Sequence, residues 1–139
     1  PRDGTGNLLA GLWHETNTQG AGIMYRVIDT PRLFDVLRDH DFGGATATLG
    51  LTLTDSFLPE NAGRTVLRVD NGRATLLDGG AADVEMALDV SNFSSLIVGA
   101  VDFARLHGYG LATISDPAAV PLVDRLFRAG QRPWCMTHF

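Results

Sequence analysis

Lysine is missing from this chain of 139 residues, and every one of its 11 basic residues is an arginine. The chain therefore cannot form a Schiff base on lysine or complete a P-loop, which ends in Gly-Lys-Ser/Thr. The glycine-containing residues 4–7 are accordingly interpreted as a lead-in rather than a phosphate-binding loop. A single cysteine, Cys135, excludes an internal disulfide.

Long apolar runs and an excess of basic charge are also missing. No run approaches the roughly 20 residues of a membrane span, and no signal peptide is visible, so we expect a cytoplasmic protein without a membrane partner. Acidic residues outnumber basic ones 16 to 11, giving a net charge of -5. Because nucleic acids select basic surfaces, this balance argues against a nucleic-acid partner.

The composition is that of one ordinary globular domain, with 45% hydrophobic and 19% charged residues. Residues 1–11 are predicted to be a linker, and residues 12–139 a single domain. The sequence starts at Pro1 without methionine. We therefore expect it to be a fragment or a processed product of a longer protein.

The first third of the chain predicts two strands and a helix. One strand is expected near Trp13 and a second over residues 22–29, with Ile23, Tyr25 and Val27 on one face. Thr30 is predicted to cap the helix that follows, with Pro31 at its first position and residues 41–44 as its stop. The apolar face of this helix is expected to hold Leu33, Phe34 and Leu37.

The middle of the chain reads as β-structure. Residues 45–54 alternate apolar and small polar side chains, as expected for a strand with one buried face. Asn71-Gly72 lies between two apolar runs, which is a strong hairpin signal. Residues 83–90 alternate again, and the pattern predicts an antiparallel meander of three or four strands. The inward-facing residues of this last run are expected to be Val84, Met86, Leu88 and Val90.

The last third predicts helices. Ser91 and Asp102 are expected to cap two of them, the second ending at Gly108, and Asp116-Pro117 opens a third that Gly130 stops. Pro121 is expected to blunt the start of this third helix. Its apolar stripe is predicted to be Val123, Leu126 and Phe127. The fold class is therefore α+β, a mostly antiparallel sheet of about five strands with helices packed on one face.

Local motifs provide no complete active site. Cys135 and His138 form a C-x-x-H pair, but two ligands do not make a zinc site, so no metal is expected. Residues 19–24 hold only the first half of an acetyl-CoA loop and precede a strand-like segment, so no cofactor-binding residue is assigned. Asp55 and Glu60 are interpreted as part of a turn between strands. His14, His40 and His107 are interpreted as surface or hydrogen-bonded residues. Ser94 and Ser95 lie in a predicted helix without the G-x-S-x-G motif of a nucleophilic serine.

Four stretches occur in the order found in one family. They read GIMYRVIDTPRLFDVL, LTLTDSFLPENAGRTVLRV, ALDVSNFSSLIVGAVDFARLHGYG and RPWCMTHF, and the match runs from about Leu12 to Phe139. Its most specific pieces are the D-x-F-L-P-x-N-x-G loop at residues 55–63, the L-x-x-L-x-x-G pattern near residues 96–99 and the aromatic C-terminus. Together they resemble the C-terminal domain of the enhanced intracellular survival (Eis-type) bacterial acetyltransferases, which has a sterol-carrier-protein-like fold.

The resemblance implies a non-catalytic accessory domain of an N-acetyltransferase. Two acetyltransferase folds would precede it in the parent chain, and the first of them would bind acetyl-CoA. The terminal α-carboxylate of Phe139 would enter the active site and help to deprotonate a small amine acceptor. His138 and Trp134 would lie on the acceptor side, although His138 departs from the acidic residue found there in some members. The fragment by itself would not be an enzyme.

The chemistry of a terminal carboxylate is consistent with this role. An amine must lose a proton to attack a thioester, and a positioned carboxylate can accept that proton. Its unperturbed pKa of about 3.3–3.7 makes it a weak base unless it is desolvated, for which the apolar side chains of the tail are suited. Two alternatives stay open: a lipid or sterol carrier with an apolar tunnel, and a purely structural oligomerisation domain.

Overall fold

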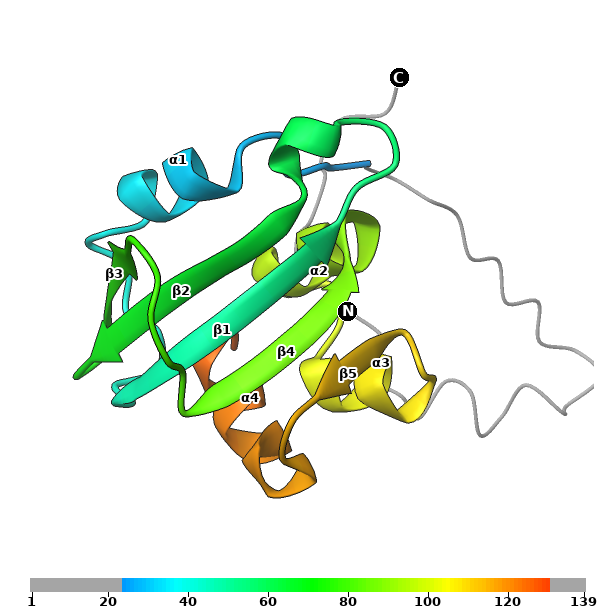
Figure 1. Cartoon of the computed structure of the whole chain (residues 1–139). Coiled ribbons are helices and arrows are strands. Elements are labelled where there is room, and N and C mark those ends of the chain that lie inside the picture. Colours follow the sequence, from blue (N-terminus) through cyan, green and yellow to red (C-terminus); the bar gives the residue numbers. More distant parts are fainter. Residues whose placement is uncertain (1–23, 131–139) are drawn as a thin grey trace, which may run out of the picture.

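A five-stranded sheet in the order β3-β2-β1-β4-β5 organises the fold (Figure 1). The computed structural model describes residues 24–130, so the strand predicted near Trp13 lies outside the described residues. Three of the four strand pairings are antiparallel, and β1 pairs with β4 in parallel. The strands are β1 (Ala47–Thr54), β2 (Gly63–Asp70), β3 (Arg73–Leu77), β4 (Val84–Asp89) and β5 (Ala112–Ile114).

The β1–β2–β3 part of the sheet is the meander that the sequence predicts. Asn71 and Gly72 form the β2–β3 turn with φ values of 46° and 80°, the left-handed conformation that a tight hairpin needs. Alternation places the leucines of β1 on the covered face of the sheet, where each is at most 3% exposed. These leucines are Leu49, Leu51 and Leu53.

The meander has three strands, the lower of the two numbers predicted, because β4 does not continue it. The chain returns past β2 and runs alongside β1 in the same direction. Asp83 attaches the returning chain to β1 by two hydrogen bonds. Its N–H donates to the Thr48 carbonyl at 2.8 Å, and its carboxylate accepts from the Thr48 N–H at 2.8 Å. Val84, Met86 and Leu88 are inward, as predicted, and Val90 is buried as the first residue of the next helix.

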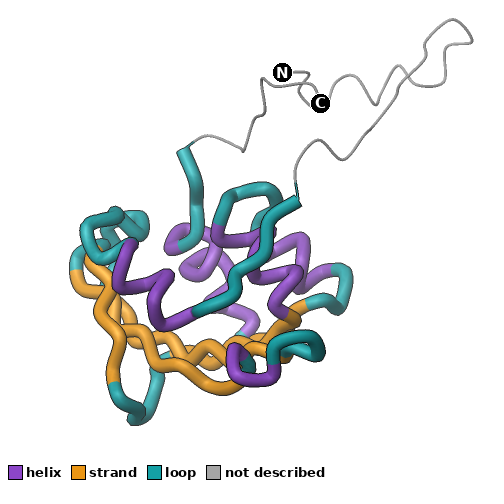
Figure 2. The backbone as a smooth tube through the Cα atoms, turned by 90° about the horizontal axis from the view of Figure 1, so that it is seen from above, coloured by secondary structure: helices purple, strands orange, loops and turns teal. Residues whose placement is uncertain are grey.

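All four α-helices lie on one side of the sheet (Figure 2), so the predicted α+β fold class is confirmed. The strand β5, a three-residue edge strand, was missed by the sequence analysis because it is too short to show a period. The helices are α1 (Thr30–Val36), α2 (Val90–Ile97), α3 (Phe103–Gly108) and α4 (Val120–Leu126), with short 3-10 turns η2 (Pro59–Asn61) and η3 (Pro117–Ala119).

Four phenylalanines fill the space between these helices and the sheet. Phe34 of α1 lies 6.2 Å from Phe42 and 6.3 Å from Phe93 of α2, measured between ring centroids. Phe127, directly after α4, closes the ring at 6.2 Å from Phe93 and 6.3 Å from Phe42. All four are at most 6% exposed, and separations of this kind suit tilted and edge-to-face aromatic packing.

The predicted strand over residues 22–29 is wrong for the part that the structure describes. Residues 24–28 pair with no strand, and Tyr25 is exposed. The cap of the next helix is one residue earlier than predicted, because the Asp29 carboxylate accepts from the Arg32 N–H at 2.9 Å. Thr30 is instead buried and bonded to Asn61. The predicted apolar face of α1 is confirmed, with Phe34 buried and Leu33 and Leu37 packed against the core.

Aspartate side chains also cap the N-termini of α2, α3 and η3. Asp102 caps α3 as predicted and Gly108 is its last residue. Asp89, not Ser91, caps α2. The third predicted helix is split into η3, capped by Asp116, and α4, which ends at Leu126 rather than at Gly130. Its predicted stripe is confirmed, since Val123, Leu126 and Phe127 are buried.

The opposite face of the sheet carries an ion pair across β1. The Arg64 guanidinium donates to the Glu85 carboxylate at 2.6 Å, and the pair crosses over Gly50. A side chain at Gly50 would overlap that carboxylate, with its Cβ only 2.0 Å from a Glu85 oxygen. The Arg64 hydrogen bond also lowers the pKa of Glu85. Among residues 24–130, no helix has the length and apolarity needed to cross a bilayer.

Candidate functional site

The residues predicted to act at an acceptor site, Trp134, His138 and Phe139, lie outside the described residues. The described chain ends at Gly130, so the site features that can be described are those surrounding this end and the loop that joins β1 to β2. Three features stand out: a cavity at the end of α4, a groove between α1 and α2, and a loop at residues 55–61 whose two polar ends are buried.

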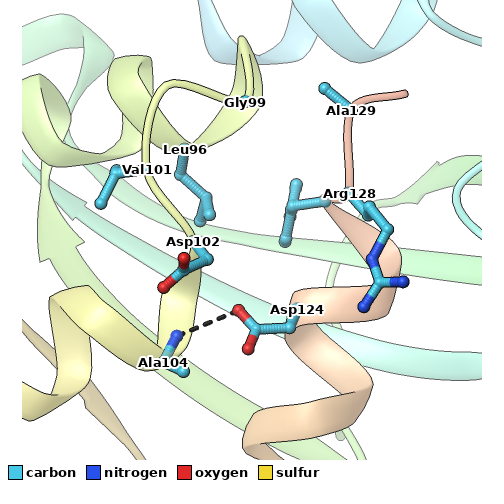
Figure 3. Close-up of a pocket in the computed structure, with 9 residues that line it drawn as sticks. Leu96, Gly99, Val101, Asp102, Ala104, Asp124, Arg128 and Ala129 are labelled. Carbon is cyan, nitrogen blue, oxygen red and sulfur yellow. Dashed lines mark hydrogen bonds between the residues drawn. The ribbon is translucent and has the colours of Figure 1, made fainter. Parts of the chain in front are cut away.

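The α4-end cavity has a volume of about 420 Å³ and lies between the α2–α3 connection and the end of α4 (Figure 3). Asp124 turns its carboxylate toward α3 and accepts from the Ala104 N–H at 3.0 Å. Asp102, on the same side, accepts from the Arg105 N–H at 2.9 Å. Both acids therefore satisfy backbone groups in the first turn of α3. The remaining lining includes Leu96, Gly99, Val101, Phe127, Arg128 and Ala129.

Gly99 allows the end of the described chain to pack against the α2–α3 connection. Its φ is +74°, and a Cβ added there would lie 2.2 Å from the Cβ of Ala129. Only glycine satisfies both the left-handed backbone and this close approach without strain. The L-x-x-L-x-x-G pattern noted in the sequence therefore has a structural reason at its glycine.

The α1–α2 groove is the second opening on the helical side, with a volume of about 440 Å³. None of the described residues that line the α4-end cavity or the α1–α2 groove belongs to a β-strand. The openings are thus formed by helices and connections, while phenylalanines occupy the space next to the sheet. The apolar lining of the groove includes Val27, Ile28, Leu33, Val36, Ile97 and Val98, beside the charged residues Arg26, Asp29 and Arg32.

The loop from Asp55 to Asn61 was predicted to be a turn, and it is one, but its two polar ends are buried. The Asp55 carboxylate accepts from the backbone N–H groups of Phe57 at 3.0 Å and Leu58 at 2.8 Å. It also accepts from the Asn61 side-chain amide at 3.2 Å and pairs with the Arg26 guanidinium. Its side chain is fully buried, with an exposed fraction of 0%.

Asn61 extends this network to the segment that enters α1. Its side-chain oxygen accepts from the N–H and the hydroxyl of Thr30 at 3.0 and 2.9 Å. Its amide nitrogen donates to the Val27 carbonyl at 3.0 Å, and the Val27 N–H donates to the Ser94 hydroxyl of α2 at 2.9 Å. Residues 26–30 are thereby attached to the loop and to α2 by polar contacts rather than by strand pairing.

The charge state of Asp55 follows from these contacts. Burial, the largest single influence, raises the pKa of this carboxyl. The contacts act in the opposite direction and together leave its pKa below the ordinary value of 3.8. In order of size they come from Leu58, Asn61, Phe57 and Arg26. Asp55 is therefore an ionised acceptor at neutral pH and is suited to holding the loop, not to donating a proton.

The polar side chains of the described residues are engaged in hydrogen bonds wherever they are buried. Within residues 24–130, every buried side-chain nitrogen or oxygen has a hydrogen-bond partner, and no three His, Cys, Asp or Glu side chains gather as metal ligands. The Nδ1–H of His107 donates to the Ala112 carbonyl at 3.2 Å, the hydrogen-bonded role expected of it. The buried Asp55–Asn61 network was missed as a network. Its only signal in the sequence was the D-x-F-L-P-x-N-x-G pattern.

Comparison with known proteins gives a family model and several acetyltransferases. Residues 35–136 match the model described as sterol carrier protein domain. An uncharacterized N-acetyltransferase from Streptomyces griseus is 29% identical over 118 residues. That alignment covers 85% of this chain but only 27% of the relative, so the chain spans about a quarter of the length of the curated relatives it matches.

Solved structures also resemble this chain over only part of their length. A GCN5-related N-acetyltransferase from Kribbella flavida superposes with a TM-score of 0.64 and 25% identity over 82% of this chain and 29% of that one. Eis1 from Mycobacterium abscessus superposes with a TM-score of 0.58 and 25% identity, over 77% and 26% of the two chains. In both cases the similarity is confined to about a quarter of a much longer protein.

Proposed function

The chain belongs to the sterol carrier protein domain family, and from this we propose that it is an accessory domain of an N-acetyltransferase. The catalytic acetyltransferase folds, which would bind acetyl-CoA, lie in the remainder of the parent chain. The domain shapes the pocket for a small amine acceptor and presents the C-terminal carboxylate to it. This is the arrangement of the Eis-type enzymes that the sequence resembles.

One observation carries the proposal: the same region of sequence and structure recurs as about a quarter of longer proteins named N-acetyltransferases. The interior of the domain supports an accessory role. Four phenylalanines pack together between helices and sheet, and every buried side-chain nitrogen or oxygen of the described residues has a hydrogen-bond partner. A domain built in this way is suited to supporting a site that another fold completes.

Phe139 is the residue proposed to act, through its α-carboxylate. An ammonium acceptor must be deprotonated before its nitrogen attacks the thioester carbonyl of acetyl-CoA, and a carboxylate within hydrogen-bond reach can take that proton. The proton moves from the ammonium nitrogen to the carboxylate oxygen, after which the free amine attacks and coenzyme A leaves as the thiol. Trp134 and His138 would flank the acceptor.

The parent enzyme with one extra residue after Phe139 tests the proposal. The extension moves the negative charge away from the reacting nitrogen, so kcat/KM should fall by about 100-fold, the usual size of a lost general base. Phe139→Leu keeps a terminal carboxylate at the same position and should retain most activity. Equal activity of the extended and native enzymes, at equal thermal stability, would refute the role of the carboxylate. Acetylation by the isolated domain would refute the accessory assignment.

A carrier function is the second candidate, and the α1–α2 groove favours it. The groove is mostly apolar and its volume of about 440 Å³ lies in the range of small-molecule pockets. Native mass spectrometry of the purified chain, followed by displacement of a fluorescent fatty acid, separates the two functions. A stoichiometric lipid that the probe displaces would favour the carrier, whereas no retained lipid and no saturable binding would favour the accessory domain.

A further inference from the structure

The α1–α2 groove is bordered by large apolar side chains that lie open to solvent. Val36 of α1 is 70% exposed and Ile28, on the segment before α1, is 66% exposed, and both line the groove. Met24, at the start of the same segment, is 93% exposed. Contiguous apolar surface around a concavity is typical of a site that something covers.

The end of the described chain lies beside this groove. Ala129 approaches Gly99 so closely that a Cβ on Gly99 would overlap it, and the neighbouring residue Val98 lines the groove. The described part of the chain therefore ends near the α2 side of the groove, beside the α4-end cavity that Gly99 and Ala129 line. Because an extended chain advances about 3.3–3.6 Å per residue, residue 135 can reach roughly 17 Å from Gly130.

The composition of residues 131–139 suits such a site. Trp134, Met136 and Phe139 are large and apolar, and no acidic side chain occurs among these nine residues. Aromatic side chains bury about 150–250 Å² each, so one tryptophan can cover much of a small groove. The lead-in also contains a tryptophan, Trp13, but nine mostly polar or glycine residues separate it from Ile23.

We propose that the C-terminal segment of this chain docks in the α1–α2 groove, with Trp134 as its apolar anchor. Docking covers the exposed side chains of Ile28 and Val36. It also limits the space that the last five residues can reach, because they extend from Trp134, which docking holds in one place. The inference extends the proposed function but stands apart from it, because docking within the 139-residue chain needs no acetyltransferase activity.

The chain provides its own probe, because Cys135 is its single cysteine. A second cysteine at Val36→Cys places a thiol on the groove wall, at an exposed position that tolerates substitution. Tyr109→Cys is the matched control, since Tyr109 is 74% exposed and does not line the groove. A disulfide requires Cα atoms within about 7 Å, so only a docked tail brings Cys135 and the groove thiol together often.

Under mild oxidation at low protein concentration, the Val36→Cys chain should form its intramolecular disulfide at least about tenfold faster than the Tyr109→Cys chain, because docking raises the effective thiol concentration. Mass spectrometry identifies the bridge. Equal rates for the two variants would overturn the proposal. If adding a residue after Phe139 left the acetyltransferase activity of the parent enzyme unchanged while the crosslink still formed, only the proposed function would be overturned.

Two further variants identify the occupant. Adding Trp134→Ala to the Val36→Cys chain should remove the rate advantage, and adding Trp13→Ala should leave it. The reverse result would assign the groove to the lead-in and overturn the proposal. A crosslink that forms rapidly only after extraction of a bound lipid, identified by native mass spectrometry, would assign the groove to that lipid and would also overturn it.

Discussion

The side-chain amide of Asn61 donates to the buried carboxylate of Asp55 at 3.2 Å, and this contact joins the two ends of the loop between β1 and β2. Asn61 then reaches across to Thr30 and Val27, on a segment about thirty residues earlier in the chain. One amide thus uses its donors and its acceptor to connect the loop with the start of α1. Fully satisfied buried networks of this kind stabilise one arrangement of the chain.

Replacing Asn61 should test the strength of this connection. Asn61→Ala leaves Oδ2 of Asp55 and the Val27 carbonyl without the Asn61 donor, and the Thr30 N–H without its acceptor. Leaving buried polar groups unsatisfied costs about 1–3 kcal/mol each. We expect the free energy of unfolding, measured by urea denaturation, to fall by about 2–4 kcal/mol. Glu60→Ala, at an exposed position in the same turn, should change it little. Equal effects of the two variants would contradict a stabilising role for the network.

The lowered pKa of Asp55 predicts acid sensitivity. Its folded pKa lies below the ordinary 3.8, so its ionisation stabilises the fold above that value, and the contribution is lost as the pH falls through the folded pKa. Asp55→Asn should therefore have a lower free energy of unfolding than the native chain at pH 6. The difference between the two free energies should be smaller at pH 3. Residual acid sensitivity is expected, because the pKa values of Glu85 and Asp89 are lowered too.

The control for this titration is Asp78→Asn, which removes the same charge at an exposed position. In urea unfolding at pH 6 this control should lose less stability than Asp55→Asn, because Asp78 is exposed and the Asp55 carboxylate is buried. If the free energies of unfolding of the Asp55→Asn and native chains differed by the same amount at pH 3 and pH 6, the stabilising role of ionised Asp55 would be contradicted.

The role of Gly99 can be tested with a second substitution that should restore part of the lost stability. Gly99→Ala should destabilise the fold for two reasons: the left-handed backbone, at about 1–2 kcal/mol, and the overlap with Ala129. The double variant Gly99→Ala/Ala129→Gly removes the overlap and retains the backbone strain. Thermal and urea unfolding should show partial recovery, leaving a deficit of about 1–2 kcal/mol. Additive losses in the double variant would show that the two residues do not contact each other.

Phe93 is the point where the aromatic rings of α1, α2 and α4 converge. It is 0% exposed and neighbours both Phe34 and Phe127. Phe93→Ala should lower the free energy of unfolding by about 3–5 kcal/mol, the usual cost of a cavity from a buried phenylalanine. Phe57→Ala is the matched control, since Phe57 is 77% exposed and stacks only on Arg26 among the aromatic and cation–π contacts of residues 24–130. Its loss should be about 0.5–1 kcal/mol.

Elements whose signals are local were predictable from the sequence. Asn71-Gly72 dictates a left-handed turn, the alternation in β1 separates two faces, and Asp102 satisfies the free N–H groups of a helix that begins one residue later. Each of these depends on residues within a few positions of one another. The tail residues Trp134, His138 and Phe139 lie outside the described residues, so their roles stay predictions.

Contacts between distant residues decided the rest. Residues 24–28 have the pattern of a strand, but the polar groups of Val27 bond to Ser94 and Asn61 instead of to a neighbouring strand. The parallel pairing of β4 with β1 depends on Asp83 meeting Thr48, 35 positions away in the sequence. No local pattern specifies such a meeting, because the hydrogen bonds exist only once both segments have been brought together.

The sequence by itself therefore determined the α+β class, the hairpin, the apolar faces and the resemblance of its motifs to one acetyltransferase domain. Periodicity and turn chemistry act over a few residues and need no partner. Only the tertiary structure decided that Asp55 is the buried centre of a network rather than part of an ordinary turn, and that Gly99 lets Ala129 pack against the α2–α3 connection. Burial and close approach are properties of the assembled chain, so they follow from packing and not from spacing along the sequence.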